Sequence, residues 1–517
     1  MRLLINLVVL VVMFNLVNSY KILVFFPYPG KSHSMLGEGF VRHLVKGGHN
    51  ITYVTAIPLK NPPPNVRQID VISIFFLVEE ELDIGKVLRQ DSRMMDLSLG
   101  FQLMLNVTYD AISHENVQRL LMDPTEEFDV AIVEWLFSDL YSGLASVFGC
   151  PLIWSSSMEP HPFVMFLIGD TPNPAYLPSQ MSPWTPPMTF VQRVKELWIV
   201  ALALGFPWTY YTSNFEKLYS PAFQIRGREI PVYEDVLYNA SLMFGNSHVS
   251  QGFALALPQN YVPIAGYHMN DEVAPLPKNF QAILDNAKHG VIYFSLGSMM
   301  PGKTWPDELK RDLLKTFSKL KQTVIWKLEV SLTDVPSNVH IVEWAPQQSI
   351  LAHPNTIIFI THGGLLSTIE TIHFGVPIIG IPLFGDQFVN IARAVAKGIG
   401  LNVDLTYDMP INLENAIQEI LGNSRLQQVN EISSLFHSRP MTPGQLINYW
   451  VDHVIKTKGA RYLRTLGLDV PLYQKLYLDF IALLTLSSIL LYYLMKLLIR
   501  KVIAKLKGRL HEKKKKN

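Results

Sequence analysis

Apolar runs alternate with amphipathic segments in two parts of the chain, which a proline-rich joint at residues 274–277 separates. Runs typical of buried strands lie at residues 21–26, 50–55, 130–134 and 151–155 in the first part, and at residues 291–295, 323–327, 340–342, 357–361 and 377–381 in the second. Helical or loop sequence separates these runs, and residues 35–46 show a helical pattern. Continuous apolar strands of this kind are typical of parallel sheets that helices cover on both faces.

This order of elements predicts an α/β protein with two doubly wound, Rossmann-like domains that face each other across a cleft. We assign residues 20–270 to an N-terminal domain and residues 285–470 to a C-terminal domain. Ligands of such sheets bind at the carboxyl ends of the strands, so functional residues are expected there. The dense prolines and serines of residues 172–187 predict a long loop on the substrate side.

Both ends of the chain carry segments that predict targeting to a membrane. Arg2 and the apolar run that follows predict a secretory signal peptide at residues 1–19. The alternatives, a membrane anchor or a buried first strand, fit less well because the run is short for a span. Residues 476–495 contain Asp479 as their single charged residue, and at 1.5 Å per residue they can cross a hydrocarbon core of about 30 Å. A transmembrane helix is therefore predicted at residues 476–495.

The charges beyond this helix predict its orientation. The tail at residues 496–517 contains ten basic residues against one acidic residue, which favours a cytosolic tail and a lumenal body, the type I topology. Three acceptor sequons, at Asn50, Asn106 and Asn239, are candidate glycosylation sites, although Asn50 adjoins a predicted strand. Lys514 and Lys515 resemble the dilysine signal of endoplasmic reticulum membrane proteins, and the alternative is a solvated tail that touches anionic lipid.

Composition limits the classes of partner. Hydrophobic residues make up 49% of the chain and charged residues 17%, which excludes a mainly disordered protein. The net charge of +1 conceals an acidic body, because basic residues are concentrated in the tail, and an acidic body argues against nucleic acid as a partner. A single cysteine, Cys150, excludes an internal disulfide framework and a cysteine-based zinc site.

A candidate phosphate site follows the predicted strand at residues 357–361. Glycines in the turn allow close approach of a ligand, and the amides of a helix that begins near Leu365 would point at it. The cradle for a diphosphate would consist of Thr361, His362, Gly363, Gly364, Ser367 and Thr368. The alternative is an ordinary polar turn capped by Ser367, since two glycines alone are weak evidence.

The segment from Trp344 to Gln387 contains a set of motifs at fixed spacings. They are WAPQ, HP at residues 353–354, THGG, Glu370, GVP at residues 375–377, Pro382 and FGDQ at residues 384–387. Together they resemble the signature of the UDP-glycosyltransferases, and the likeness, strongest to insect membrane-bound members, extends from Ser32 and His33 to the lysine tail. The resemblance implies a GT-B-like fold in which the N-terminal domain binds the acceptor and the C-terminal domain binds the UDP-sugar.

The resemblance also assigns the nucleotide contacts. Trp344 would stack on the uracil ring, and Gln347 would bind the edge of the base or ribose through its amide. Glu370 would accept hydrogen bonds from the ribose hydroxyls. Taken singly, Trp344 could equally be a core residue and Glu370 a surface charge on a helix.

The phosphate and sugar contacts follow in the same way. Ser298 and His362 would contact the diphosphate, and Asp386 and Gln387 would bind hydroxyls of the sugar, although Asp386 alone could also be a helix cap. The chain departs from the family pattern at Leu366, where many relatives carry asparagine beside the serine. The phosphate would then depend more on backbone amides and Ser367.

Transfer of a sugar to an alcohol requires removal of a proton from a weak nucleophile, a task suited to histidine. His33 follows the first predicted strand and matches the position of the family's base. A carboxylate would hold its second ring nitrogen. The family places this acid at the end of the strand that contains Phe128, Asp129 and Val130, which here gives Glu134, with Asp139 as the alternate.

These assignments predict direct displacement at the anomeric carbon with inversion. The chain contains no Asp-x-Asp pair, so we expect no metal and no cofactor, the UDP-sugar being a co-substrate. The expected partners are a UDP-sugar, most simply UDP-glucose, a small lipophilic acceptor and membrane lipid, and the sequence leaves a homo-oligomer open. The alternatives are a transferase that uses UDP-glucuronate and a lumenal binding protein that has lost the reaction.

Overall fold

The computed structural model describes residues 19–75, 84–88, 97–170, 173–180, 182–205, 208–270, 272–298, 300, 302–422 and 425–516. The predicted signal peptide lies outside this set except for Ser19. The chain divides into a body, which ends at Arg464, and a C-terminal unit that begins at Thr465.

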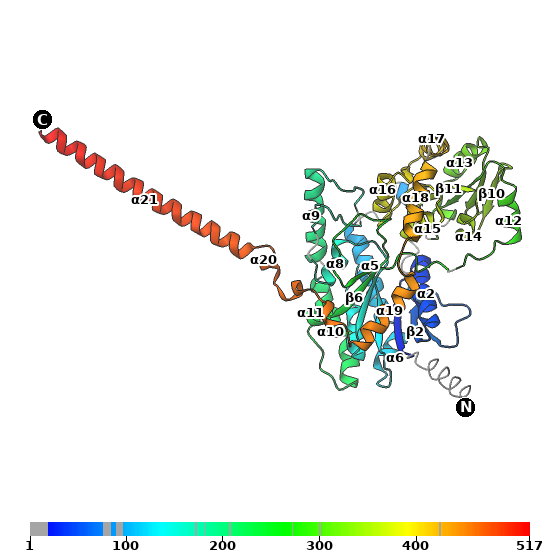
Figure 1. Cartoon of the computed structure of the whole chain (residues 1–517), viewed down its shortest axis with the longest axis horizontal. Helices are drawn as coiled ribbons and strands as arrows, with labels where there is room; N and C mark the ends of the chain where they lie inside the picture. Colours follow the sequence, from blue (N-terminus) through cyan, green and yellow to red (C-terminus); the bar gives the residue numbers. More distant parts are fainter. Residues whose placement is uncertain are drawn as a thin grey trace, which may run out of the picture. The chain divides into compact units, whose positions relative to one another are not determined.

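The first half of the body contains a parallel sheet (Figure 1). In the described residues its order is β3-β2-β1-β4-β5-β6-β7. The strands are β1 (Lys21–Phe26), β2 (Asn50–Thr55), β3 (Val66–Asp70), β4 (Val130–Trp135), β5 (Leu152–Ser156), β6 (Ala240–Gly245) and β7 (Tyr261–Pro263). Helices α2 (Lys31–Lys46), α4 (Ile84–Leu88), α5 (Leu97–Ser113), α6 (Glu115–Met122), α7 (Ser142–Phe148), α8 (Pro162–Leu167), α9 (Phe190–Gly205), α10 (Trp208–Ile225) and α11 (Tyr233–Leu237) accompany it.

The second half contains another parallel sheet, of order β10-β9-β8-β11-β12-β13 in the described part. The strands are β8 (Val291–Ser295), β9 (Thr323–Lys327), β10 (Val339–Val342), β11 (Thr356–Thr361), β12 (Ile378–Gly380) and β13 (Gly400–Asn402). Helices α12 (Lys278–Asp285), α13 (Asp307–Ser318), α14 (Gln347–Leu351), α15 (Leu365–Phe374), α16 (Gln387–Ala396), α17 (Met409–Gly422), α18 (Arg425–His437) and α19 (Pro443–Lys456) follow in the chain. The predicted pair of doubly wound sheets is thus confirmed.

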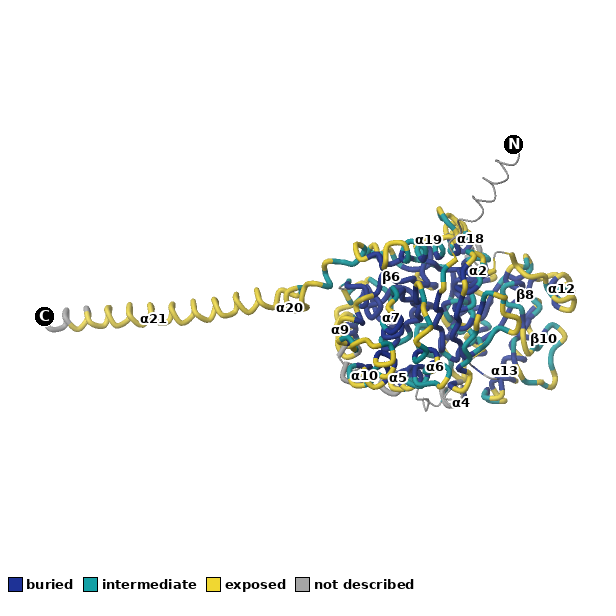
Figure 2. Tube along the Cα trace, turned by 90° about the horizontal axis from the view of Figure 1, so that it is seen from below, coloured by how far each residue is buried: buried dark blue, intermediate teal, exposed yellow. Residues whose placement is uncertain are grey.

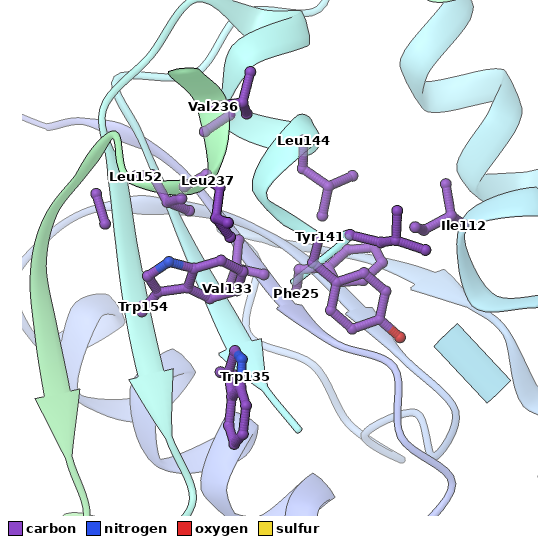
Figure 3. Close-up of a cluster of buried hydrophobic side chains, with 14 of the residues drawn as sticks. Phe25, Ile112, Val133, Trp135, Tyr141, Leu144, Leu152, Trp154, Val236 and Leu237 are labelled. Atoms are coloured by element: carbon purple, nitrogen blue, oxygen red, sulfur yellow. The ribbon is translucent and has the colours of Figure 1, made fainter. Parts of the chain in front are cut away.

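Each sheet is buried on both faces, which explains the continuous apolar runs. In β1, Leu23 and Phe25 belong to one hydrophobic cluster, whereas Ile22, Val24 and Phe26 belong to another on the opposite face. Figure 3 shows the first cluster, where Phe25, Val133 and Trp154 from neighbouring strands pack against helix side chains such as Leu144. Successive residues of a strand point to opposite faces, so each face needs its own cover of helices.

Helix α19 follows the second sheet in sequence but packs on the first half of the body (Figure 1). Its residues Ile447, Val451 and Val454 join the hydrophobic cluster of α2 and β1. Asn448 donates a hydrogen bond to the carbonyl of His43 in α2 at 3.0 Å. The end of the body therefore stabilises its beginning.

The C-terminal unit contains α20 (Leu472–Lys475) and α21 (Leu478–Lys516). The segment Leu478–Gly508 of α21 is long and apolar enough to cross a membrane. The described residues of α21 are exposed (Figure 2). The helix continues past the predicted span at residues 476–495 because lysine and arginine are good helix formers.

Candidate active site

A cavity of about 530 Å³ lies where the carboxyl ends of both sheets meet. From the first half it is lined by residues that follow β1, β4 and β5, including Lys31, His33, Phe137 and Met158. From the second half it is lined by residues at or beyond the ends of β8, β9, β10, β11 and β12. This position is the expected ligand site of open parallel sheets.

His33 lies in the first turn of α2 and borders this cavity. Its Nδ1 forms a short contact with Oε1 of Glu134, the penultimate residue of β4, whose side chain is buried. The Tyr28 ring packs edge-on against the imidazole, with 4.6 Å between ring centroids. The imidazole is thus held on two sides, and Nε2 remains as the nitrogen that can accept a proton.

Opposing effects set the pKa of His33. Burial lowers the pKa, but the charge of Glu134, the hydrogen bond with Glu134 and the charge of Asp386 raise it by more. The pKa of His33 therefore lies above its usual value near 6.5. Asp386 belongs to the second half of the body, so the two halves interact electrostatically at this imidazole.

Asp139, the alternate partner from the sequence, has a different neighbour. Its Oδ1 accepts a hydrogen bond from Nε1 of Trp135 at 2.6 Å. Burial raises the pKa of its carboxyl group to about 6, and the opposing effect of the Trp135 hydrogen bond, which lowers the pKa, is smaller. The geometry brings Glu134 to His33 and leaves Asp139 to orient an indole.

The turn after β11 depends on glycine for its shape. Gly363 has φ +83°, and a Cβ there would lie 2.4 Å from a side-chain atom of Ile391. A Cβ on Gly364 would lie 2.6 Å from Nε2 of His362. Helix α15 begins at Leu365, and its first-turn amides, which have no acceptor within the helix, belong to cavity-lining residues 365–367. Among the residues of the predicted cradle, Thr361 and Thr368 instead bond to the turn itself.

His362 is a neutral polar group at this turn. Burial, together with the smaller effect of the Lys327 charge, lowers its pKa to about 4. Its Nδ1 is buried and has no hydrogen-bond partner among the described residues. Gly297, at φ +83°, lets the turn after β8 approach the ring of His362, since a Cβ at residue 297 would lie 2.8 Å from Cε1 of that ring. Ser298 follows, exposed in the cavity.

Glu370 lies at the centre of a buried polar network. Its Oε2 accepts a hydrogen bond from Nε2 of Gln347 at 2.6 Å, and its Oε1 accepts one from Nε2 of Gln348 at 3.0 Å. His268 Nε2 lies 3.4 Å from the same Oε1, and Gln347 also donates to the Ser367 hydroxyl at 3.1 Å. All of these side chains line the cavity.

Trp344 is the exposed aromatic of the cavity, with 58% of its surface accessible. The ammonium groups of Lys31 and Lys327 each lie 5.5 Å from its ring centroid. An exposed indole next to two cations offers a flat surface to an anionic aromatic ligand such as a nucleotide.

Asp386 and Gln387 precede and begin α16. Asp386 Oδ2 accepts a hydrogen bond from Asn390 at 2.9 Å, and burial raises the pKa of Asp386. Gln387 Oε1 accepts from the amides of Leu383 and Phe384 at 2.8 and 3.2 Å, which leaves its NH₂ group as a donor to a ligand. Leu366 lines the cavity and also packs against the hydrophobic cluster of α2 and β1.

Several cavity residues with a contact to this machinery were not identified from the sequence, among them Tyr28, Lys31, His268, Lys327 and Gln348. Lys31 and Gln348 stand next to identified motifs, which is a signal that could have found them. His268 and Lys327 carry no local signal, since only folding brings them to Glu370 and Trp344.

The three sequon asparagines are all exposed. Asn50 is the first residue of β2, and its amide donates to the Ser19 hydroxyl at 3.1 Å. Asn106 lies in α5 and Asn239 precedes β6.

Comparison with known proteins gives consistent matches. A protein-family model described as UDP-glucoronosyl and UDP-glucosyl transferase matches residues 79–517. UDP-glucosyltransferase 2 of Dactylopius coccus is 34% identical over 471 residues, 90% of each chain. Human UDP-glucuronosyltransferase 2B7 is 28% identical over 478 residues, 88% of each chain. The structure of TcCGT1 in complex with UDP matches with a TM-score of 0.54 at 15% identity and covers 85% of this chain and 100% of that one, which shows a shared fold.

Proposed function

Since the chain belongs to the UDP-glycosyltransferase family, we propose that it transfers a hexose from a UDP-sugar, preferably UDP-glucose, to a hydroxyl of a small lipophilic acceptor, with inversion and without a metal. The observation that carries this proposal is the His33–Glu134 pair at the edge of the cavity. A histidine fixed by a buried carboxylate is suited to take a proton from an alcohol.

The proposed reaction is a single displacement. The acceptor hydroxyl gives its proton to Nε2 of His33, its oxygen bonds to the anomeric carbon, and the bond from that carbon to the UDP oxygen breaks. Glu134 stabilises the imidazolium. The charge on the departing diphosphate is stabilised by the first turn of α15, by neutral His362 and by Ser298, which together offer positive dipoles and donors.

In the donor site, Trp344 stacks on uracil, Glu370 and Gln347 bind the ribose and base, and Asp386 and Gln387 bind the hexose. UDP-glucose is preferred over UDP-glucuronate because a carboxylate on the hexose would face the charge of Asp386. The acceptor end is apolar, with Met104, Leu136, Phe137 and Met158 lining it. Apolar walls with few polar groups suit a lipophilic acceptor.

The test is to incubate the detergent-solubilised full chain with UDP-glucose or UDP-glucuronate and a panel of phenols and steroids, and to identify products by mass. We expect a hexoside from UDP-glucose, β-configured by NMR, and a rate that EDTA leaves unchanged. Loss of the rate with EDTA would overturn metal independence. UDP binding without turnover of either donor would favour the non-catalytic binding protein.

We further propose that the protein is a single-pass endoplasmic reticulum membrane protein with a lumenal body and a cytosolic tail. The apolar helix at Leu478–Gly508 and the exposed asparagines at positions 106 and 239 support this topology. Expression in cells followed by endoglycosidase H should increase the mobility of the protein on a gel. The Asn106→Gln/Asn239→Gln variant should lose most of that shift, and a wild type insensitive to the enzyme would contradict the lumenal placement.

A further inference from the structure

Helix α9 presents an apolar face to solvent. Among residues 190–202 of this helix (Phe190–Gly205), whose side chains the structure describes, the exposed apolar residues are Phe190, Val191, Val194, Leu197, Trp198, Ala201 and Leu202. Phe190, Leu197, Trp198 and Leu202 are each 60% exposed or more. Figure 1 places α9 at the side of the body away from β10. Contiguous exposed apolar surface of this kind marks an interaction site.

The residues form one stripe with basic borders. At 100° per residue, the seven side chains fall within an arc of about 140°. Arg193 lies beyond one border of this arc and Lys195 beyond the other, and both are exposed. An apolar stripe with an interfacial tryptophan and basic margins is the pattern of a helix that lies in the plane of a membrane surface.

The opposite face of α9 is anchored in the protein. Glu196 is fully buried and its carboxylate accepts hydrogen bonds from the Ser179 amide at 2.7 Å, from Nε1 of Trp184 at 3.1 Å and from the Ser182 hydroxyl. Val200 is buried on the same side. These bonds join α9 to the proline- and serine-rich loop, and they fix which face of the helix points outward.

We propose that the outward face of α9 binds the lipid bilayer, with Trp198 and the basic residues at the level of the headgroups. Lipid fits better than a protein partner because both margins are basic, which matches anionic headgroups. The same chain also carries Leu478–Gly508, long and apolar enough to span a membrane, so weak lipid affinity of α9 would act at high local concentration. This attachment is separate from the transfer reaction and does not depend on the proposed donor or acceptor.

The test uses the full chain in vesicles of phosphatidylcholine with phosphatidylserine. An environment-sensitive fluorophore is attached at Leu197→Cys, and in a matched protein at Ile411→Cys, an exposed apolar position of α17. Labelling at pH 7 spares Cys150, because burial raises the pKa of its thiol to about 12. We expect brominated lipid to quench the Leu197 probe several-fold more than the Ile411 probe. Equal quenching, or protection of the Leu197 probe by a second copy of the chain in detergent without quenching in lipid, would overturn the proposal.

A second experiment tests the face as a unit. The probe is moved to Leu202→Cys, and the substitutions Val194→Asp and Trp198→Asp are added. Quenching at residue 202 should fall to the level of the Ile411 control, while retention of UDP binding shows that the body is folded. Unchanged quenching in the folded variant would contradict the assignment of lipid binding to this face.

Discussion

His33 and Glu134 are 101 residues apart in sequence, yet they meet because their strands are neighbours. Val133, in β4, is paired with Phe25 of β1, so the residues just beyond these positions lie together at the carboxyl edge of the sheet. The sequence predicted both residue types but left Glu134 and Asp139 as alternatives. The choice depends on the direction of each side chain at the end of β4, which no local pattern reveals.

Substitution of the two acids should separate their roles. Glu134→Gln should reduce kcat by roughly 10²-fold or more, because the imidazolium loses its charged partner. Asp139→Asn should change kcat by only a few-fold, since the amide oxygen can still accept from Trp135. Steady-state kinetics with saturating donor measures both, and a larger loss in Asp139→Asn would transfer the supporting role to Asp139.

The raised pKa of His33 predicts a pH dependence. The base must be neutral to accept a proton, so kcat/KM should fall on the acidic side with an apparent pKa above 6.5. Glu134→Gln removes the charge that raises the pKa while burial, which lowers it, remains, so this limb should move to lower pH. Asp386→Asn should move it in the same direction by less. An acidic limb that stays in place in both variants would show that His33 is not the group that titrates.

At the scale of elements, the central strands were predictable and several edge strands were not. The bounds of β1, β2, β8 and β9 agree with the apolar runs, because a strand covered on both faces is buried along most of its length and therefore reads as a mainly apolar run. The edge strands β3, β7 and β13 were missed, since β3 is mostly half-exposed and the others have three residues each. Strand β6 was also missed, although it is fully buried, because small residues begin and end it. Helix α2 begins at Lys31, four residues before the expected start, and that first turn contains the candidate base.

The turn after β11 offers a test of element geometry. Gly363→Ala should lower the free energy of unfolding by about 2–4 kcal/mol. An alanine there is strained by the left-handed backbone conformation, and its Cβ would also lie too close to the Ile391 side chain. Gly422→Ala is the matched control, because a Cβ there meets no atom within 4 Å and helical alanine is favourable. Thermal unfolding in detergent with and without UDP measures both. Equal melting temperatures for the two variants would contradict the tight packing of this turn.

At the scale of the whole body, buried charges link its two halves. Glu159 follows β5 and is buried, and burial raises its pKa to about 7, although the charges of Arg393 and Lys397 act to lower it. Arg393 belongs to α16 in the second half, and burial lowers the pKa of its guanidinium group, because burial disfavours the charged form of this group as it does that of Glu159. Burial of these ionisable groups in the folded body therefore costs free energy, and the cost depends on pH.

The sign of this effect is open to measurement. A glutamate with a pKa near 4.5 when unfolded and about 7 when folded makes stability fall as pH rises between those values, by up to roughly 3 kcal/mol. Glu159→Gln removes that cost. The melting temperature of the variant minus that of the wild type should therefore become larger between pH 5 and pH 8. A difference between the two proteins that is constant over this range would show that Glu159 is ionised in the folded state.

The sequence by itself determined many of the elements, although not the edge strands or β6, and the residue types of the candidate site. Continuous apolar runs predicted parallel sheets, the glycine turn predicted the start of α15, and a long apolar run predicted the long apolar helix α21, because each depends on neighbours along the chain. Tertiary structure decided which acid meets His33, that Gln348 and His268 join Gln347 at Glu370, and that α19 returns to the first sheet. It also decided that the apolar residues of α9 face outward. These contacts join residues from different strands and helices, and only the packing of the sheets sets the distances between them.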